Sequence, residues 1–337
     1  MSALAIVGAG SLGQAFAALL ARSGQPVTLL ATPGTAARLR EAGRVRLRGV
    51  VTAEIAVAAA PGPAGTVGVT ADPAALPAGA GLLFMTKGHQ LRAAASAVRA
   101  AWPAAGDGWV GGVQNGLAKD DRLAEAFGAE RVVGAVTILG AAREPDGAIA
   151  VAALGRTYLG EFDGRRSARV AAAVAALGKA GIPAEEPADI RSVLWSKACN
   201  AAGVFGVSVL GRVSAPRLFR DPDLIRAYLG LVRETAALAG AHGVPVGDYT
   251  SFSIRTYVRR PDEETVAALS AQGFLAPAQG LESFPSMTQD LLAGRGLEVD
   301  EVFGDLVERA DRAVVAVPRL RLVRDLIRGL DPGRHPA

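Results

Sequence analysis

The sequence predicts an α/β N-terminal domain whose sheet has an antiparallel extension, followed by an all-α C-terminal domain. Up to Phe127, short apolar runs alternate with helix-like segments, which indicates a parallel sheet with helices between its strands. After Arg131, strand-like segments follow one another without helices. Beyond Pro187, apolar residues recur at the helical spacing of about 3.6 residues. We expect one domain at 1–187 and a second at 188–337, which suits a chain of 337 residues.

The N-terminal stretch combines a strand, a glycine turn and a helix. Ala3–Val7 is continuously apolar, and Gly8, Gly10 and Gly13 follow it in G-x-G-x-x-G spacing. Gly8 would allow the tight turn, Gly10 the approach of a pyrophosphate, and Gly13 the packing of the helix on the strand. This pattern predicts a dinucleotide-binding, Rossmann-type domain; the alternative is a purely structural glycine turn. The residues of the turn expected to bind the cofactor are Gly8, Gly10, Ser11, Leu12 and Gly13.

Two further apolar runs of this domain end in polar residues. Gly81–Thr86 leads into Lys87, and Trp109–Val113 leads into Gln114 and Asn115. Because the carboxyl ends of parallel strands line the ligand crevice, Lys87 and Asn115 are candidate site residues. The other elements expected here are a strand at Pro26–Ala31, a helix at Gly34–Gly43, strand-like residues at Val45–Val57, a loop at Ala58–Gly65, and helices at Leu91–Ala101 and Lys119–Phe127.

The later elements change in kind. The strand-like segments Val132–Gly140, Ala148–Ala153 and Thr157–Glu161 are expected to extend the same sheet in antiparallel fashion. A helix at Arg165–Ala180 and a short strand at Ile182–Glu185 complete the domain. The main helices of the C-terminal domain are expected at Ile190–Leu210, Asp223–His242, Glu263–Ser270 and Leu297–Val315.

Composition and charge argue against several classes of protein. The first charged residue is Arg22, but 1–21 lack a basic leader and contain three glycines, so we expect neither a signal peptide nor a membrane segment there. The formal charge of +4 is modest and comes without a nucleic-acid-reading motif. A single cysteine, Cys199, and three histidines argue against disulfides and a dedicated metal site. We expect a cytoplasmic monomer or homodimer that acts on a small molecule.

Lysine is rare in this chain. Of the 36 basic residues only four are lysines, at positions 87, 119, 179 and 197. Arginine holds its proton too tightly for acid–base chemistry, whereas burial can tune a lysine. Lys197 and Asn200 lie three residues apart, hence on one face of a helix with apolar neighbours. Lys197 is therefore a candidate catalytic residue, the alternative being a solvated surface lysine; Lys119 and Lys179 are expected on solvated helical surfaces.

One further segment lies near the C-terminus, where Ser286-Met287 is followed by Glu298 and Asp300. Taken alone, these two carboxylates would be ordinary negative charges in the first turn of a helix. Five segments of the chain carry a resemblance to a known family: this one, the GAGSLG turn, Thr86-Lys87, Gln114-Asn115-Gly116 and Leu194-Trp195-Ser196-Lys197. Through them the sequence resembles the ketopantoate reductase (2-dehydropantoate 2-reductase) family over nearly the whole chain. The resemblance implies a Rossmann domain, a helical domain, and a cleft between them in which NADPH reduces a 2-keto acid, as in pantothenate biosynthesis.

The resemblance also implies roles for individual residues. Lys197 would donate a proton to the ketone oxygen, and Glu298 would orient the substrate and the lysine. Asn115 would lie by the nicotinamide and the substrate, Lys87 on the cofactor side, and Ser286 at the substrate. Asn200 is a further substrate-binding candidate. These roles agree with the chemistry, because hydride addition to a ketone leaves an alkoxide that needs a nearby acid and is stabilised by a cation.

Three departures from the family pattern concern the cofactor and the substrate. Thr32 stands where an arginine usually holds the 2′-phosphate of NADPH, which leaves Arg38 and Arg40 as substitutes. No acidic residue stands there to favour NADH, so Thr32 and Arg38 are assigned to NADPH. Ala201 and Phe205 replace asparagines that are common in the family, and 249–284 is longer than usual.

The two substrate-side departures leave the substrate open. It is either 2-dehydropantoate or another, more apolar 2-keto acid. A non-catalytic nucleotide-binding protein is the remaining alternative, and the presence of Lys197 and Glu298 in an arginine-dominated chain argues against it.

Overall fold

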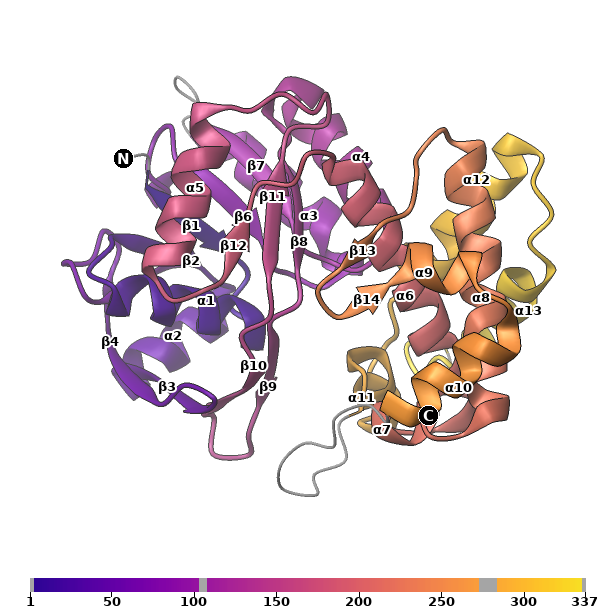
Figure 1. Cartoon of the computed structure of the whole chain (residues 1–337). Helices are drawn as coiled ribbons and strands as arrows, with labels where there is room; N and C mark the ends of the chain where they lie inside the picture. Colours follow the sequence, from indigo (N-terminus) through magenta and orange to yellow (C-terminus); the bar gives the residue numbers. More distant parts are fainter. Residues whose placement is uncertain (1–2, 103–107, 273–283, 335–337) are drawn as a thin grey trace. The chain divides into compact units, whose positions relative to one another are not determined.

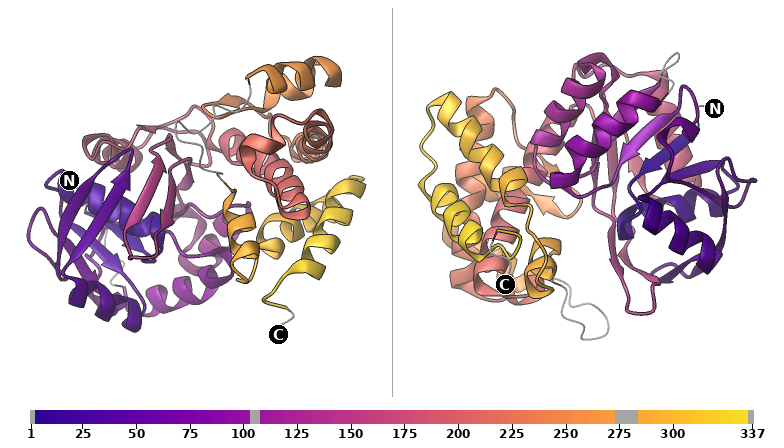
Figure 2. Two further views of the ribbon diagram at one scale, coloured as in Figure 1. Left: turned by 90° about the horizontal axis from the view of Figure 1, so that it is seen from below. Right: turned by 180° about the vertical axis from the view of Figure 1, so that it is seen from behind.

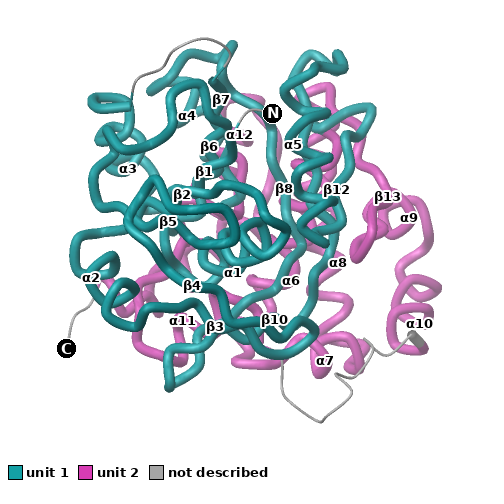
Figure 3. Tube along the Cα trace, turned by 90° about the vertical axis from the view of Figure 1, so that its left-hand side faces the viewer, with its two compact units in different colours: residues 1–114, 119–191 teal, residues 115–118, 192–337 magenta. Residues whose placement is uncertain are grey.

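The computed structural model describes residues 3–102, 108–272 and 284–334. The chain forms two compact units, one of residues 1–114 and 119–191, the other of residues 115–118 and 192–337 (Figure 3). The long segment at 249–284 lies partly outside the described residues, since 273–283 are not among them.

Unit 1 contains a row of parallel strands that are buried along their whole length. Burial on both faces explains why they are continuous apolar runs rather than alternating ones. In register, Val7 pairs with Leu30 on one side and with Phe84 on the other, so the carboxyl ends of three strands meet at one edge. The parallel strands are β1 Leu4–Val7, β2 Val27–Leu30, β5 Val67–Thr70, β6 Gly81–Phe84 and β7 Trp109–Gly112.

Between β2 and β5 the chain forms an antiparallel hairpin of β3 Arg44–Gly49 and β4 Ala53–Ala59, and β4 pairs with β5 in parallel. The expected strand-like residues at Val45–Val57 are therefore two strands. Sequence analysis did not predict β5, because Gly68 interrupts the apolar run that marks the other buried strands.

The predicted antiparallel extension is present at the far edge of the sheet. β9 Gly140–Arg143 and β10 Ile149–Ala153 are antiparallel to each other, and β10 pairs with β3. The large sheet thus has nine strands in the order β7-β6-β1-β2-β5-β4-β3-β10-β9 (Figure 1).

Two of the segments predicted for this extension, β8 Gly134–Thr137 and β11 Thr157–Gly160, instead form a separate, three-stranded sheet with the short strand β12 Ala184–Glu185. The prediction of one strand at Val132–Gly140 is wrong. The hydroxyl of Thr137 accepts the amide N–H of Leu139 at 3.2 Å, and this local turn ends β8 before β9 begins.

The helices of unit 1 are α1 Ser11–Arg22, α2 Pro33–Ala42, α3 Gly88–Ala101, α4 Ala118–Phe127 and α5 Ala168–Lys179, with short 3₁₀ turns η1 Pro73–Ala75 and η2 Ala129–Arg131. They cover both faces of the large sheet (Figure 2). Along β1, Leu4 and Ile6 belong to the apolar cluster that includes α1 and α5, whereas Ala5 and Val7 belong to the cluster that includes α3 and α4. This alternation is the two-residue period of a strand.

Over the residues that the structure describes, unit 2 is helical except for a minimal hairpin of β13 Asp248–Tyr249 and β14 Phe252–Ser253. The predicted helix at Leu297–Val315 is a π-helical segment, η3, continued by an α-helix. A last helix, Pro318–Leu330, was not predicted because it carries leucines on both faces: Leu320 is buried and Leu322 is exposed. The helices of the unit are α6 Ile190–Gly211, α7 Ala215–Leu218, α8 Pro222–Ala241, α9 Ile254–Arg259, α10 Asp262–Gln272, α11 Ser286–Leu292, η3 Asp300–Gly304, α12 Asp305–Ala313 and α13 Pro318–Leu330.

By length and composition, α6 could cross a membrane. Within the structure, 78% of its most apolar 18-residue window is buried. The apolar surface of α6 therefore serves the packing of the protein.

Candidate functional site

The glycine turn after β1 has the close packing that the sequence predicts. The amide of Gly8 donates to the carbonyl oxygen of Leu30 at 2.9 Å, and the φ of Gly8 is 112°. A Cβ on Gly8 would lie 2.7 Å from the amide nitrogen of Thr86, and one on Gly13 would lie 1.9 Å from the Gly8 carbonyl oxygen. The fold itself requires both glycines. From the sequence alone, Gly13→Trp would be expected to leave a folded protein; the Gly13 geometry contradicts that expectation.

Gly10 is a different case. Its φ of −70° and ψ of −174° suit any residue, and a Cβ there would meet no atom within 4 Å. Gly10 is the N-cap of α1, and the first amides of a helix, here those of Ser11 and Leu12, have no acceptor within the helix. The turn is therefore open where an anion would approach, and the residues present fit the pyrophosphate of a dinucleotide.

Thr32 and Arg38 are linked at the carboxyl end of β2. The hydroxyls of Thr32 and Thr35 lie 3.1 Å apart, and Nη2 of Arg38 donates to the Thr35 hydroxyl at 2.9 Å. Arg38 lines a cleft beside α2 and Arg40 does not, since a spacing of two places them on different faces of the helix. The structure thus favours Arg38 over Arg40 as the substitute for the missing arginine.

Lys87 and Gln114 lie at the ends of β6 and β7. Lys87 is the half-buried N-cap of α3, and its amide donates to Oε1 of Gln90 at 3.3 Å. Nε2 of Gln114 donates to the carbonyl oxygen of Phe84 at 3.0 Å and ties the two strand ends together. The carboxyl edge of the parallel sheet therefore carries Lys87, as predicted.

Asn115 belongs to unit 2, with the short segment 115–118. The next residue, Gly116, has a φ of 85°, and a Cβ there would lie 2.0 Å from the carbonyl oxygen of Glu301 in η3. The Asn115 segment thus packs closely on η3, which follows Glu298 in the chain. The structure brings these two predicted site segments together.

Lys197 and Asn200 lie on α6 and are both half-buried, so Lys197 is not a fully solvated lysine. Oδ1 of Asn200 accepts the hydroxyl of Tyr228 in α8 at 2.9 Å, which leaves the NH₂ group of Asn200 as a donor. Tyr228 is fully buried, and this burial raises the pKa of its hydroxyl. Sequence analysis missed Tyr228, which resembles a core aromatic residue at helical spacing.

Burial also accounts for two neighbours of Lys197. Ser196 has no exposed surface, and its hydroxyl accepts the amide of Gly247 at 2.8 Å. Cys199 is a free thiol whose pKa is raised by burial, so it is a packing residue rather than a nucleophile. Within the described parts of the chain, no group of three or more His, Cys, Asp or Glu side chains could hold a metal ion.

Glu298 is 6% exposed and lies two residues before the π-helical η3, a kind of irregularity that is frequent at functional sites. Its carbonyl oxygen accepts the amide of Val302 at 3.2 Å. Ser286, in contrast, lies exposed in the first turn of α11. The described contacts do not join Ser286 to Glu298.

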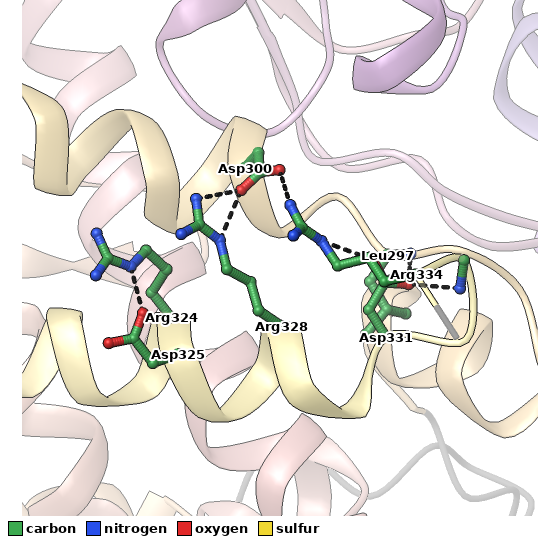
Figure 4. Close-up of polar contacts among 8 residues, drawn as sticks. Leu297, Asp300, Arg324, Asp325, Arg328, Asp331 and Arg334 are labelled. Carbon is green, nitrogen blue, oxygen red and sulfur yellow. Dashed lines mark hydrogen bonds and ion pairs between the residues drawn. The ribbon is translucent and has the colours of Figure 1, made fainter. Parts of the chain in front are cut away.

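Two aspartates anchor the segment around Glu298 (Figure 4). Oδ1 of Asp331 accepts the amide of Leu297 at 2.9 Å, and Asp300 accepts Nε of Arg328 at 2.9 Å and Nη2 of Arg334 at 2.6 Å. Asp300 is thus a structural residue on the C-terminal side of Glu298. Although burial opposes the shift, hydrogen bonds from Arg328 and Arg334 lower the pKa of Asp300.

We expect the Asp300 ion pairs to make unit 2 sensitive to acid. Because the pKa of Asp300 is lower in the folded protein, its stabilising effect is present above the unfolded pKa of about 3.9 and is lost as the pH falls through the folded value. Asp300→Asn should lower stability at neutral pH and flatten the decline of stability below about pH 5. Urea unfolding at a series of pH values measures this; Asp223→Asn, which removes a 92% exposed partner of Arg226, is the control. Identical pH profiles for wild type and Asp300→Asn would contradict the expectation.

Lys119 corrects a prediction. It is 4% exposed, and its Nζ contacts both carboxylate oxygens of Asp120 at 2.7 Å. It is therefore not a solvated surface residue. Its aliphatic side chain packs near Gly112 at the end of β7, and its charge is paired with Asp120. Lys179, at the end of α5, is exposed as predicted.

Comparison with known proteins gives one family for both units. Residues 4–164 match the family described as ketopantoate reductase PanE/ApbA, and residues 189–331 match its C-terminal domain. A 2-dehydropantoate 2-reductase of Halobacterium salinarum is 31% identical over 328 residues, which are 96% of this chain and 97% of the relative. The crystal structure of 2-dehydropantoate 2-reductase from Geobacter metallireducens is similar with a TM-score of 0.78 and 25% identity, over 97% of this chain and 99% of that one. D-mandelate dehydrogenase, in a ternary structure with NADH and anilino(oxo)acetate, shares the fold with a TM-score of 0.77 and 19% identity, over 98% and 99% of the two chains.

A glycine turn at the carboxyl edge of a parallel sheet, followed in the same chain by a helical unit, defines a Rossmann-type oxidoreductase. The chain belongs to the ketopantoate reductase family.

Proposed function

We propose that the protein uses NADPH to reduce a 2-keto acid to the 2-hydroxy acid, with 2-dehydropantoate as the first candidate substrate. The observation that carries the proposal is Lys197, half-buried on the core helix α6 in a chain with only four lysines. Burial of a lysine among apolar neighbours costs free energy unless its charge is paired or used. Relatives that match over nearly the whole chain are 2-dehydropantoate 2-reductases, which supports the choice of substrate.

When bound, the cofactor supplies a hydride to the keto carbon. In this proposal Gly8, Gly10, Ser11, Leu12 and Gly13 hold the pyrophosphate. Thr32 and Arg38 hold the adenosine end, and Lys87 and Asn115 the nicotinamide end. The domain at 1–187 is thus the cofactor domain, and the domain at 188–337 the substrate domain.

The substrate domain performs the proton chemistry. The ammonium group of Lys197 lies at the ketone oxygen, stabilises the charge that develops there and donates a proton to it. Glu298 orients the substrate and Lys197, while Asn200, fixed by Tyr228, donates a hydrogen bond to the substrate. Ser286 and Asn115 contribute further polar contacts to the substrate.

A more apolar 2-keto acid is the second candidate. Ala201 and Phe205, which stand where the family commonly has asparagines, are 5% and 7% exposed and add apolar surface to the helix of Lys197. If these apolar side chains contact the substrate where the family has amides, a larger hydrocarbon substituent on the keto acid is favoured. Both candidates share the same chemistry at Lys197 and differ in the pocket.

The test follows the oxidation of NADPH and NADH against a panel of 2-keto acids that includes 2-dehydropantoate and aliphatic and aromatic analogues. Highest kcat/KM with NADPH and 2-dehydropantoate supports the first candidate, and a preference for a bulkier apolar member supports the second. Failure to oxidise either cofactor with any member contradicts the proposal.

A further inference from the structure

A cleft of about 360 Å³ in unit 1 is lined by one predicted cofactor residue, Arg38, and by residues that the sequence did not assign to the site. Four elements contribute to its wall: α1, α2, the β3–β4 hairpin and the end of β9. Its lining residues include Gln14, Thr35, Arg38, Arg46 and Arg143. The wall thus combines several guanidinium groups with uncharged hydrogen-bonding side chains and with two carboxylates, those of Glu54 and Asp146.

The arginines of this cleft are of two kinds. Arg44 and Arg46 are neutralised, the first by Glu54 at 3.0 Å and the second by Asp146 at 3.2 Å. Arg38 and Arg143 contact no carboxylate among the residues that the structure describes; Arg38 donates to Thr35, and Nη2 of Arg143 lies 3.5 Å from the carbonyl oxygen of Ala9. Desolvation and, second, the charge of Arg38 lower the pKa of Arg143. Two neighbouring guanidinium groups without a counter-charge repel each other, and a bound anion would relieve the repulsion.

The surroundings identify the anion. The carbonyl oxygen of Ala9, in the middle of the glycine turn, accepts hydrogen bonds from Nε2 of Gln14 at 2.8 Å and from Nη2 of Arg143 at 3.5 Å. Arg143 therefore reaches the turn that would hold the pyrophosphate. Arg38 reaches the hydroxyl of Thr35, next to Thr32 at the end of β2. In dinucleotide-binding folds the adenosine ribose lies at the end of the second strand, close to the glycine turn. The anion that fits between these groups is a phosphate on that ribose.

We propose that Arg143, at the end of β9, is a second cofactor-specificity residue, which binds the 2′-phosphate of NADPH together with Arg38. The inference rests on the proposed use of NADPH. Planar guanidinium groups bind phosphate oxygens bidentately, and two of them approaching from different elements would enclose the phosphate. The antiparallel extension of the sheet thereby replaces the arginine that is missing at Thr32. Sequence analysis offered no signal for this residue, which lies 134 positions from Ala9.

The test measures binding rather than activity. Titration calorimetry gives the dissociation constants of NADPH, NADH and adenosine 2′,5′-bisphosphate for wild type, Arg38→Ala, Arg143→Gln and the double variant. Each single change should weaken NADPH and the bisphosphate by about 10- to 100-fold, the usual effect of losing a charged hydrogen bond, and leave NADH unchanged. Arg143→Lys should restore part of the affinity for NADPH, because the charge is kept. Arg40→Ala, on the same helix as Arg38 but away from the cleft, is the control and should bind all three as wild type does.

Two outcomes would overturn the inference while leaving keto-acid reduction intact. One is an equal loss of NADPH and NADH affinity in Arg143→Gln, which would mean that Arg143 only supports the glycine turn through Ala9. The other is a wild type that does not distinguish NADPH from NADH. Conversely, a selective loss of NADPH affinity in a protein that reduces no 2-keto acid would support the inference and contradict the proposed function.

Discussion

Lys197→Ala is expected to lower the rate of keto-acid reduction by about 10²- to 10⁴-fold, the usual cost of losing a positioned acid–base group. The variant should fold, because alanine is a good helix former and Lys197 is only half-buried in α6. The affinity for NADPH, measured by fluorescence titration, should stay close to that of wild type, since the glycine turn belongs to unit 1. Steady-state and single-turnover rates measure the loss.

Two further substitutions of lysines, Lys197→Arg and Lys179→Ala, make the test specific. Lys197→Arg should be almost as slow as Lys197→Ala, because arginine keeps the charge but does not release a proton readily, and its planar head differs in shape from an ammonium group. Lys179→Ala, on the exposed end of α5, is the matched control and should have the wild-type rate. Lys119 is unsuitable as a control because its buried ion pair with Asp120 supports the fold. Near-normal turnover of Lys197→Ala would show that the proposed mechanism is wrong.

Gly10→Glu is expected to weaken the affinity for the cofactor by about 100-fold or more, in a protein that remains folded. The backbone of Gly10 suits any residue and its Cβ would meet nothing within 4 Å, so the substitution creates no strain. Its carboxylate, however, would lie at the N-terminus of α1, occupy the path of the pyrophosphate and repel it. Calorimetric titration with NADPH and NADH measures the affinity, and thermal unfolding checks the fold.

The matched variant is Gly10→Ala, which adds a methyl group in the same open space without a charge. It should bind the cofactor more weakly than wild type and more tightly than Gly10→Glu. Gly13→Trp cannot serve, because any Cβ at Gly13 would collide with the Gly8 carbonyl oxygen and distort the turn. If folded Gly10→Glu binds NADPH as wild type does, the glycine turn is not the pyrophosphate site.

Two lysines, Lys197 and Lys119, differ in how far their surroundings follow from the sequence. The sequence singled out Lys197 correctly as a lysine with a buried environment, since its apolar neighbours lie within one helical turn. The same reasoning failed for Lys119, because its burial depends on the strand end that packs over it and on its pairing with Asp120. The roles assigned to Lys197, Glu298 and the other site residues remain predictions that the variants above test.

The sequence by itself determined the class of fold, the glycine turn, the two kinds of domain and the family, because each is encoded in residues close together in the chain: apolar runs of strand length, a fixed glycine spacing, helical periodicity. Only the tertiary structure decided that Val132–Gly140 is shared between two sheets, that Tyr228 holds Asn200, that Asp300 and Asp331 anchor the segment of Glu298, and that Arg143 reaches the glycine turn. The physical reason is that these contacts join residues far apart in sequence. Each requires a specific packing of strands and helices, which local propensity and spacing do not specify.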